Sequence, residues 1–367
     1  MRVKPNHYWG TFNLAFVLNR LKPGSETDRL RQARDSARAT ARAADARPRS
    51  VWLNGLAFQR LRGAGDSLGA HEYLRRAQAA ASSSDFNRYL VAYWSVREAL
   101  LDRDVVRGGQ IVDRLIQELP AIEEKLSRQD FETVARSLIN ISVDLGRFRD
   151  ARIVATQLPV ADFEPMIGWA LLTIGSPGAK NSLRELVTTH YPVITQGRLD
   201  FQWALYAFYL YQLDMLGELR DIAARNQAAG PASVAREIDG YLALGEGRVD
   251  DGLRLFQSAT KAGFEDPWAR GRVALVVADA WRARGELERA TTVLESETNN
   301  WLLETLDFGA VALWVVARDR LADLYRSMGR TKEAETIDAE LLKLLAVADA
   351  DHPVLARIKA RQNKTGF

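Results

Sequence analysis

The sequence predicts an all-α protein, a solenoid of about nine antiparallel helix pairs. Apolar residues recur at helical spacing along most of the chain, and no convincing run alternates apolar and polar residues as a strand does. Turn signals interrupt the helical pattern at intervals of about 31 to 44 residues, which is the spacing of a helix-pair repeat. One pair cannot cover its own apolar face, so the pairs must stack on one another.

The clearest pair occupies residues 273–294. Val276 and Trp281 mark the apolar side of its first helix. Gly285 follows, and glycine suits the left-handed turn that ends one helix before the next begins. Leu294 belongs to the apolar side of the second helix, which we expect to pack against the first.

Four pairs precede the middle of the chain. Ser25 or Thr27 can cap the second helix of the first pair, and we expect Pro120 to end the second helix of the third pair. The predicted pairs are residues 8–21 with 27–44, 50–62 with 67–81, 85–101 with 105–119, and 131–145 with 148–157.

Five pairs follow in the rest of the chain. A short capping helix at 353–361 and a disordered tail at 362–367 are expected after the last pair. The predicted pairs are residues 166–174 with 179–190, 199–213 with 215–226, 234–244 with 249–262, the two helices of 273–294, and 314–328 with 331–345.

Composition excludes several classes of protein. With 47% hydrophobic residues, the 367-residue chain has ample material for a core, and without cysteine it has neither disulfides nor Cys-ligated zinc. A net charge of +3 is a weak argument for nucleic acid as a partner. The longest apolar stretch, residues 203–211, is far shorter than the roughly 20 residues of a membrane span. We therefore expect a soluble, cytoplasmic protein.

Several pairs resemble tetratricopeptide repeats. That pattern places a large and a small residue side by side on the first helix, an aromatic or apolar residue three positions later, Gly at the turn and Ala on the second helix. Small residues let the helices approach closely, and large ones fill the gaps between pairs. The residues that fit best are Val277, Ala278, Trp281, Gly285 and Ala290, followed by Leu321, Ala322, Tyr325, Gly329 and Ala334.

This resemblance implies a right-handed solenoid whose first helices line a concave face and bind peptides there. The match divides the chain into degenerate pairs at 1–229, better-matching repeats at 230–345, and a cap and tail at 346–367. By the same resemblance, Tyr93, Arg97, Arg136 and Asn140 face the groove. Arg136 and Asn140 share one side of a helix, and they resemble part of the clamp that holds a C-terminal carboxylate in some members.

A shorter resemblance concerns the C-terminal end. Residues 341–345 and 349–355 look like the end of repeat regions attached to bacterial Ser/Thr kinase or sensor domains. Met1 stands close to the first predicted helix, which suggests the C-terminal part of a longer protein. The alternative function is therefore a sensor or regulatory region of a larger bacterial signalling protein, such as a Ser/Thr kinase or an ATP-driven transcription regulator.

Motifs for catalysis are missing from the sequence. The four histidines have no paired ligand spacing, and Arg107-Gly108-Gly109 lacks the Lys-Ser/Thr of a phosphate-binding loop. Glu123-Glu124 and Asp250-Asp251 are typical of solvated helix starts. We predict no catalytic residues, no metal and no cofactor, and an enzyme is the disfavoured hypothesis.

An arginine stripe and an aromatic run are the remaining local features. Arg31, Arg34, Arg38 and Arg42 share one helix face, which is either a phosphate-binding surface or, as we prefer, a solvated outer face. Nucleic acid is therefore not the expected partner.

The aromatic run at 201–211 is apolar on all sides, so it is either core or part of a groove. If one side faces a groove, Gln202, Tyr206 and Tyr209 are the contact residues. The function predicted from these features is a non-catalytic scaffold that binds a protein or peptide segment in the concave groove.

Overall fold

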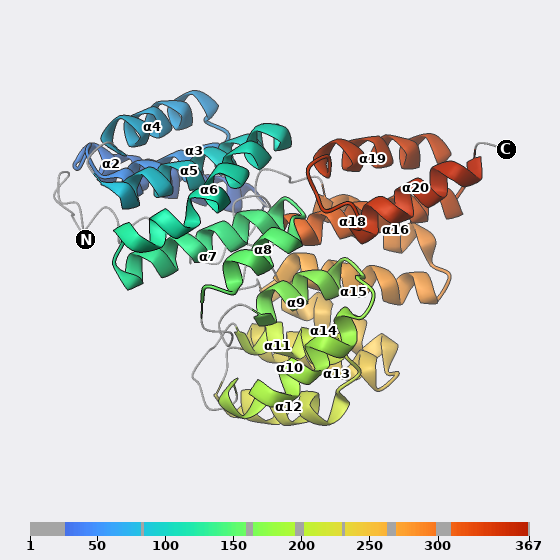
Figure 1. The fold of residues 1–367 in the computed structure, drawn as a ribbon. Coiled ribbons are helices and arrows are strands. Elements are labelled where there is room, and N and C mark those ends of the chain that lie inside the picture. Colours follow the sequence, from blue (N-terminus) through green and yellow to red (C-terminus); the bar gives the residue numbers. More distant parts are fainter. Residues whose placement is uncertain are drawn as a thin grey trace. The chain divides into compact units, whose positions relative to one another are not determined.

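The computed structural model describes residues 26–81, 84–158, 164–194, 202–229, 232–262, 269–298 and 310–365. These ranges contain eighteen α-helices and no strand (Figure 1). The prediction of an all-α protein is confirmed for them, and helices that follow one another in the sequence pack as pairs. The first predicted helix, residues 8–21, lies outside the described residues. Contacts divide the helices into unit 1, with α2 to α8, and unit 2, with α9 to α20.

Unit 1 contains three complete pairs, α3–α4, α5–α6 and α7–α8, preceded by α2. The first helices of successive pairs also contact one another, α3 with α5 and α5 with α7. The helices are α2 (Glu26–Asp45), α3 (Val51–Gly63), α4 (Ser67–Ala80), α5 (Asp85–Leu101), α6 (Val105–Lys125), α7 (Arg128–Asp144) and α8 (Phe148–Ala155).

Side-chain caps set the starts of α3 to α7. Each cap accepts a hydrogen bond from the backbone amide three residues later, which satisfies an amide with no partner inside the helix. The caps are Ser50, Asp66, Ser84, Asp104 and Ser127.

The prediction that Pro120 ends its helix is wrong, because α6 continues to Lys125. Pro120 is exposed, whereas Leu119 and Ile122 on either side are buried. Proline removes one backbone hydrogen bond from a helix. Packing of the two buried neighbours holds α6 together through that position.

Unit 2 contains eleven of the described helices. They are α9 (Glu164–Thr173), α10 (Ala179–Ile194), α11 (Gln202–Gln212), α12 (Leu216–Ala229), α13 (Ala232–Gly245), α14 (Val249–Ala262), α15 (Ala269–Ala283), α16 (Leu287–Thr298), α18 (Ala310–Ser327), α19 (Thr331–Leu344) and α20 (Pro353–Thr365). Gly285, between α15 and α16, has a φ of 76°, so it makes the left-handed turn that the sequence predicts. The helix α20 extends four residues beyond its predicted end at 361.

Ion pairs fix α20 to the rest of unit 2. Arg357 and Arg361 both donate to the buried carboxylate of Asp319 on α18, at 2.7 Å each, and Arg361 also reaches Asp338 on α19 at 2.8 Å. Arg357 further donates to the backbone carbonyl of Ile174, at the end of α9, and α9 packs directly on α18. Within the described ranges, no helix combines the length and apolarity needed to cross a membrane.

Candidate partner-binding pocket

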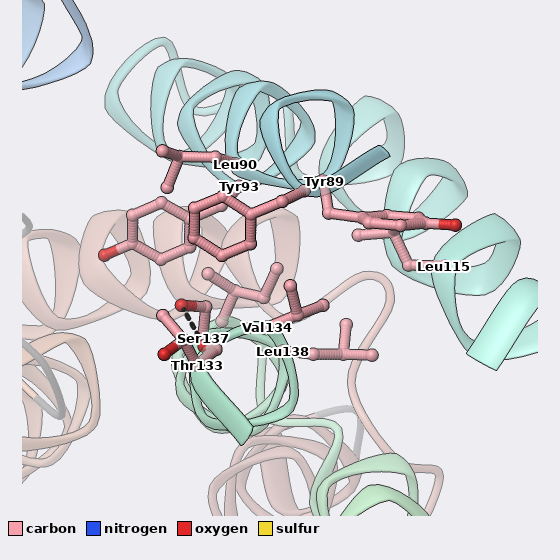
Figure 2. Close-up of a pocket in the computed structure, with 10 residues that line it drawn as sticks. Tyr89, Leu90, Tyr93, Leu115, Thr133, Val134, Ser137 and Leu138 are labelled. Atoms are coloured by element: carbon pink, nitrogen blue, oxygen red, sulfur yellow. Dashed lines mark hydrogen bonds between the residues drawn. The ribbon is translucent and has the colours of Figure 1, made fainter. Parts of the chain in front are cut away.

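A small, open pocket with a cavity volume of about 10 Å³ lies between α5, α6 and α7 of unit 1 (Figure 2). Aromatic and aliphatic side chains make up most of its lining, together with two hydroxyl groups from α7. We call it the tyrosine pocket, and it is lined by Phe86, Tyr89, Leu90, Tyr93, Leu115, Thr133, Val134, Ser137, Leu138 and Ile141.

Helical periodicity brings these side chains to one place. Phe86, Leu90 and Tyr93 recur at spacings of four and three residues, so they share one side of α5. Thr133 and Ser137, four apart, do the same on α7, and their apolar neighbours Val134, Leu138 and Ile141 form the floor. The direct packing of α5 on α7 places the two sides opposite each other.

The lining differs in exposure between its floor and its edge. Leu138 and Ile141 are buried, whereas Tyr93, Leu90 and Ser137 are half-buried and Thr133 is exposed. The Tyr93 ring meets Trp94 edge to face, with 4.9 Å between the ring centroids, an arrangement that adds to the packing energy of an aromatic pair. The pocket therefore has a fixed apolar floor and an accessible aromatic edge.

Tyr93, predicted to contact a partner, lines this pocket, but Arg97 does not. Arg97 is 1% exposed, and its guanidinium pairs with the buried carboxylate of Asp144 on α7 at 2.8 Å. Its Nε also donates to the Tyr93 hydroxyl at 3.2 Å. The prediction that Arg97 faces the groove has to be corrected, because a buried guanidinium needs a buried counter-charge and Asp144 supplies it inside the core.

Arg136 and Asn140 of α7 lie beside the pocket rather than in its lining. The sequence analysis predicts these two residues as part of a carboxylate clamp. Arg136 is exposed and Asn140 is half-buried. None of the residues that line the pocket is charged. The tyrosine pocket therefore does not have the cationic character that a carboxylate clamp requires.

Residues 202–211 of the aromatic run lie in α11 of unit 2, and most of those whose side chains are described are buried. Tyr209 is 5% exposed and packs edge to face on Tyr206, with ring centroids 5.7 Å apart. Tyr206 is half-buried, and burial raises the pKa of its hydroxyl. Tyr209 is therefore not available to a partner, while the side chain of Gln202 lies outside the described residues.

Arg31, Arg34, Arg38 and Arg42 are all exposed on α2. One acidic residue lies close to them, because the Arg38 guanidinium is 3.6 Å from the Asp35 carboxylate. Exposure fits both a solvated outer face and a phosphate-binding surface, so our preference for the solvated face stays a prediction.

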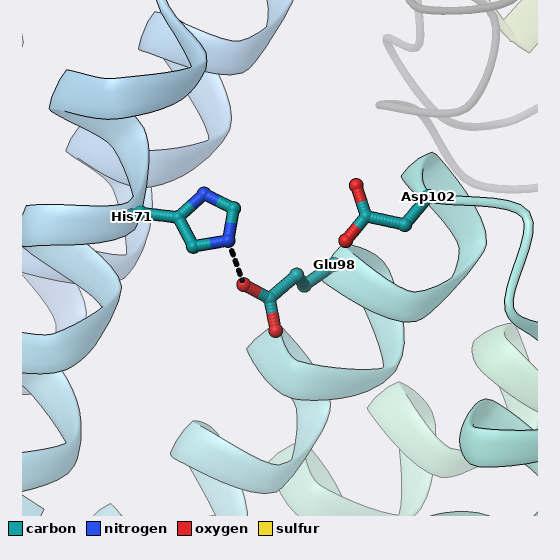
Figure 3. A group of neighbouring side chains, drawn as sticks. All are labelled: His71, Glu98 and Asp102. Atoms are coloured by element: carbon teal, nitrogen blue, oxygen red, sulfur yellow. Dashed lines mark ion pairs between the residues drawn. The ribbon is translucent and has the colours of Figure 1, made fainter.

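One cluster in the described part of the chain has the chemistry of metal ligands, namely His71 on α4 with Glu98 and Asp102 at the end of α5 (Figure 3). The His71 Nε2 atom is 3.1 Å from a Glu98 oxygen. The two carboxylates also pair with arginines: Arg62 is 2.6 Å from Asp102, and Arg107 is 3.3 Å from Glu98. A metal ion would meet these two positive charges, so we interpret the cluster as an ion-pair network.

The sequence gives no signal for this cluster, because His71 and Glu98 are far apart and form no ligand motif. Comparison of the chain with protein-family models and with curated proteins finds no match. The resemblance to tetratricopeptide repeats therefore stays a prediction made from residue patterns.

Proposed function

We propose that this protein is a non-catalytic scaffold and that a segment of a protein partner binds in the tyrosine pocket. The observation that carries the proposal is the accessible edge of Tyr93, Leu90 and Phe86 above a buried apolar floor. Tyrosine combines a large apolar area with a polar tip and loses little conformational entropy, which makes it a common anchor in protein interfaces.

The proposal includes a tetratricopeptide-like solenoid, in which first helices line the binding face. Support comes from the contacts of α3 with α5 and of α5 with α7, each of which also packs against its own second helix. Such a surface can serve a free-standing adaptor or the regulatory arm of a larger signalling protein equally well.

The lining of the pocket also favours binding over catalysis. Its hydroxyl groups on α7 both donate to carbonyl groups of their own helix, Thr133 to Gln129 at 3.0 Å and Ser137 to Thr133 at 2.9 Å. A nucleophilic hydroxyl needs a neighbouring base that accepts its proton. The lining contains no residue of that kind.

A matched pair of variants tests the proposal. Thr133→Trp would fill the pocket, whereas Thr188→Trp would place the same ring on α10 of unit 2. Both threonines are exposed, and both donate to the carbonyl four residues earlier. Peptides would first be selected from a random library on the wild-type chain, and their dissociation constants would then be measured with each variant.

We expect Thr133→Trp to weaken the selected peptides at least tenfold and Thr188→Trp to leave them unchanged, with normal helical content in both. Equal affinity for the wild-type chain and Thr133→Trp would overturn the assignment of this pocket. Failure to select any peptide would overturn the proposed function itself.

A further inference from the structure

We propose that the face of α18 and α19 that α20 covers is a docking site for an arginine-bearing helix of a partner protein, and that α20 occupies it as a resident competitor. We call it the docking face. It lies in unit 2 and does not involve the tyrosine pocket, so it is a second interaction surface. The inference follows from the pairing of the helices, from the charge of the face and from the residue pattern of α20.

Among the described residues of unit 2, α20 is the helix without a pairing partner. The other ten described helices form five pairs of sequence neighbours, whereas α20 lies alone along α18 and α19 (Figure 1). It packs on each of them far less extensively than they pack on each other. A connection of turns at residues 345–352 joins it to α19. The α18–α19 pair is therefore complete without α20, which is an added layer.

The docking face carries a buried carboxylate for which it has no counter-charge of its own. Asp319 of α18 is 2% exposed, and its two oxygens accept hydrogen bonds from Arg357 and from Arg361 of α20, at 2.7 Å each. Among the described residues of α18 and α19, no cation forms an ion pair with Asp319. A buried carboxylate needs a paired positive charge, so this face is suited to a cationic helix.

Two further carboxylates favour arginine over lysine. Arg361 also donates to Asp338 of α19 at 2.8 Å and to Asp323 of α18 at 3.1 Å. One guanidinium thus contacts three carboxylates from two helices, counting Asp319. A guanidinium has five N–H donors in a planar fork, whereas an ammonium is a point charge. The geometry therefore selects for arginine at this position of the bound helix.

The residues of α20 that enter the face define the partner. Val354 and Ile358 are fully buried and Leu355 is nearly so, which makes a short apolar stripe at helical spacing. Arg357 and Arg361 are four residues apart, so they lie one turn from each other beside that stripe. A partner helix with two arginines four residues apart and the same apolar stripe would make the same contacts, as in other complexes that seat an amphipathic helix on a surface.

The connection to α19 gives α20 an advantage over such a partner. A short linker holds a tethered segment at an effective concentration in the millimolar range, and a free partner competes against that value. α20 therefore sets a threshold, because only a helix that binds clearly better than α20 displaces it from the intact chain.

Cutting the connection removes this advantage and tests the inference. A protease site would be inserted between Ala350 and Asp351, which are both exposed, so the nicked chain keeps every residue. The probe is an isotope-labelled synthetic copy of residues 351–365, and native mass spectrometry counts the chains that carry it. The uncut insertion variant is the control, and its thermal unfolding should match that of the wild-type chain.

At about 0.1 mM probe and about tenfold less protein, we expect the probe to occupy about nine tenths of the nicked chains but only about a tenth of the uncut ones. A copy with Arg361→Gln should bind the nicked chain at least about tenfold more weakly, because it loses charged hydrogen bonds. A copy with Lys359→Gln loses the same charge from the exposed side of the helix and should bind as the unchanged copy does. An unrelated helical peptide that keeps only the three apolar residues and the two arginines should also bind.

Each of these results can contradict the inference. Failure of the probe to replace α20 in the nicked chain would overturn it. Equal affinity of the Arg361→Gln and Lys359→Gln copies would overturn the recognition of arginine. Failure of the unrelated peptide would restrict the face to the chain's own helix and overturn the access of a partner. A native mass of the uncut chain that doubles with concentration would assign the face to α20 of a second copy instead. None of these outcomes affects the tyrosine pocket, which the library selection decides independently.

Discussion

Two regions of the molecule place a tyrosine beside a buried ion pair, and only one of them is open. In unit 1, Tyr93 stands next to the Arg97–Asp144 pair, which joins α5 to α7. In unit 2, Tyr241 donates to Glu237 at 2.9 Å, and Glu237 pairs with Arg272 of α15 at 3.0 Å. Tyr93 is half-buried, whereas Tyr241 is fully buried, and burial raises the pKa of its hydroxyl well above the usual value.

The side chains that face each tyrosine ring explain why Tyr241 is covered and Tyr93 is not. On α13, Gly240 lets the ring of Phe256 approach so closely that a Cβ atom there would lie 2.7 Å from Phe256 Cε1. Phe256 and Phe208 then surround Tyr241, with ring centroids 5.0 and 5.7 Å away. In unit 1 the corresponding space faces small hydroxyl residues of α7 and stays open. An aromatic ring therefore stays accessible only where its neighbours are too small to cover it.

The largest expected effect comes from breaking the ion pairs on which both regions depend. Arg272→Met should lower the free energy of unfolding by about 3 to 5 kcal/mol, because it leaves Glu237 buried without its counter-charge. The double variant Glu237→Gln with Arg272→Met should recover most of that loss. Urea unfolding followed by tryptophan fluorescence measures both, and equal losses in the single and double variants would contradict the explanation.

Truncating one tyrosine in each region gives the next largest contrast. Tyr209→Ala removes a buried ring from unit 2 and should cost about 3 to 5 kcal/mol of stability, as other aromatic truncations in cores do. Tyr93→Ala removes a half-buried ring and should cost roughly half as much. Thermal unfolding of the two variants measures the difference, and similar losses would mean that the tyrosine pocket is as tightly packed as the core of unit 2.

Lowering the pH should destabilise unit 2, because His352 is buried without a proton. Burial lowers the pKa of this side chain to about 4, with a further decrease from the nearby Arg357 guanidinium. The unfolded chain binds the proton near pH 6.5, so stability is fully present above that pH and is lost as the pH falls towards 4. At 1.36 kcal/mol per unit, the total is about 3 kcal/mol.

His352→Gln removes this titration while keeping a polar side chain, so it serves as the control. Its unfolding midpoint should fall less than that of the wild-type chain between pH 6.5 and 4. Parallel pH profiles for the two proteins would rule out His352 as the source of the acid sensitivity.

Adding a methyl group at two glycines, one tightly packed and one open, tests the packing argument directly. Gly240→Ala should cost about 1 to 3 kcal/mol, because the added methyl group overlaps the Phe256 ring. Gly217→Ala on α12 meets no atom within 4 Å and should instead gain up to about 1 kcal/mol from lower backbone entropy in the unfolded chain. Differential scanning calorimetry of the pair would detect opposite shifts, and shifts of the same sign would contradict the packing argument.

Much of the fold could be predicted from the sequence because helix signals are local. The predicted helix at 249–262 has the same bounds as α14, and Gly285 adopts the expected left-handed turn. Pro120 shows the limit of local rules, since buried residues on either side keep α6 helical. Helical periodicity shows which face of a helix is apolar. It does not show whether the packing of that face compensates for the one hydrogen bond that a proline removes.

The site was less predictable, because it depends on which residues of other helices stand opposite. The sequence correctly indicates that Tyr93 and Arg97 share a side of their helix. It cannot reveal that Asp144, a full helix pair later, draws Arg97 into the core while Tyr93 stays at the edge. Tyr209 was ambiguous for the same reason, and its burial follows from the helices around α11.

The attachment of α20 has a consequence for synthesis on the ribosome. Arg357 donates a hydrogen bond to the carbonyl of Ile174, 183 residues earlier in the chain, so this contact of α9 cannot form until residue 357 has been translated. At 5 to 20 residues per second, α9 emerges about 10 to 40 seconds before its partner. Unit 1 draws its described helices from one continuous stretch and can fold during that interval. In a nascent chain stalled after α16, we therefore expect helices α2 to α8 to resist protease while α9 is still cleaved.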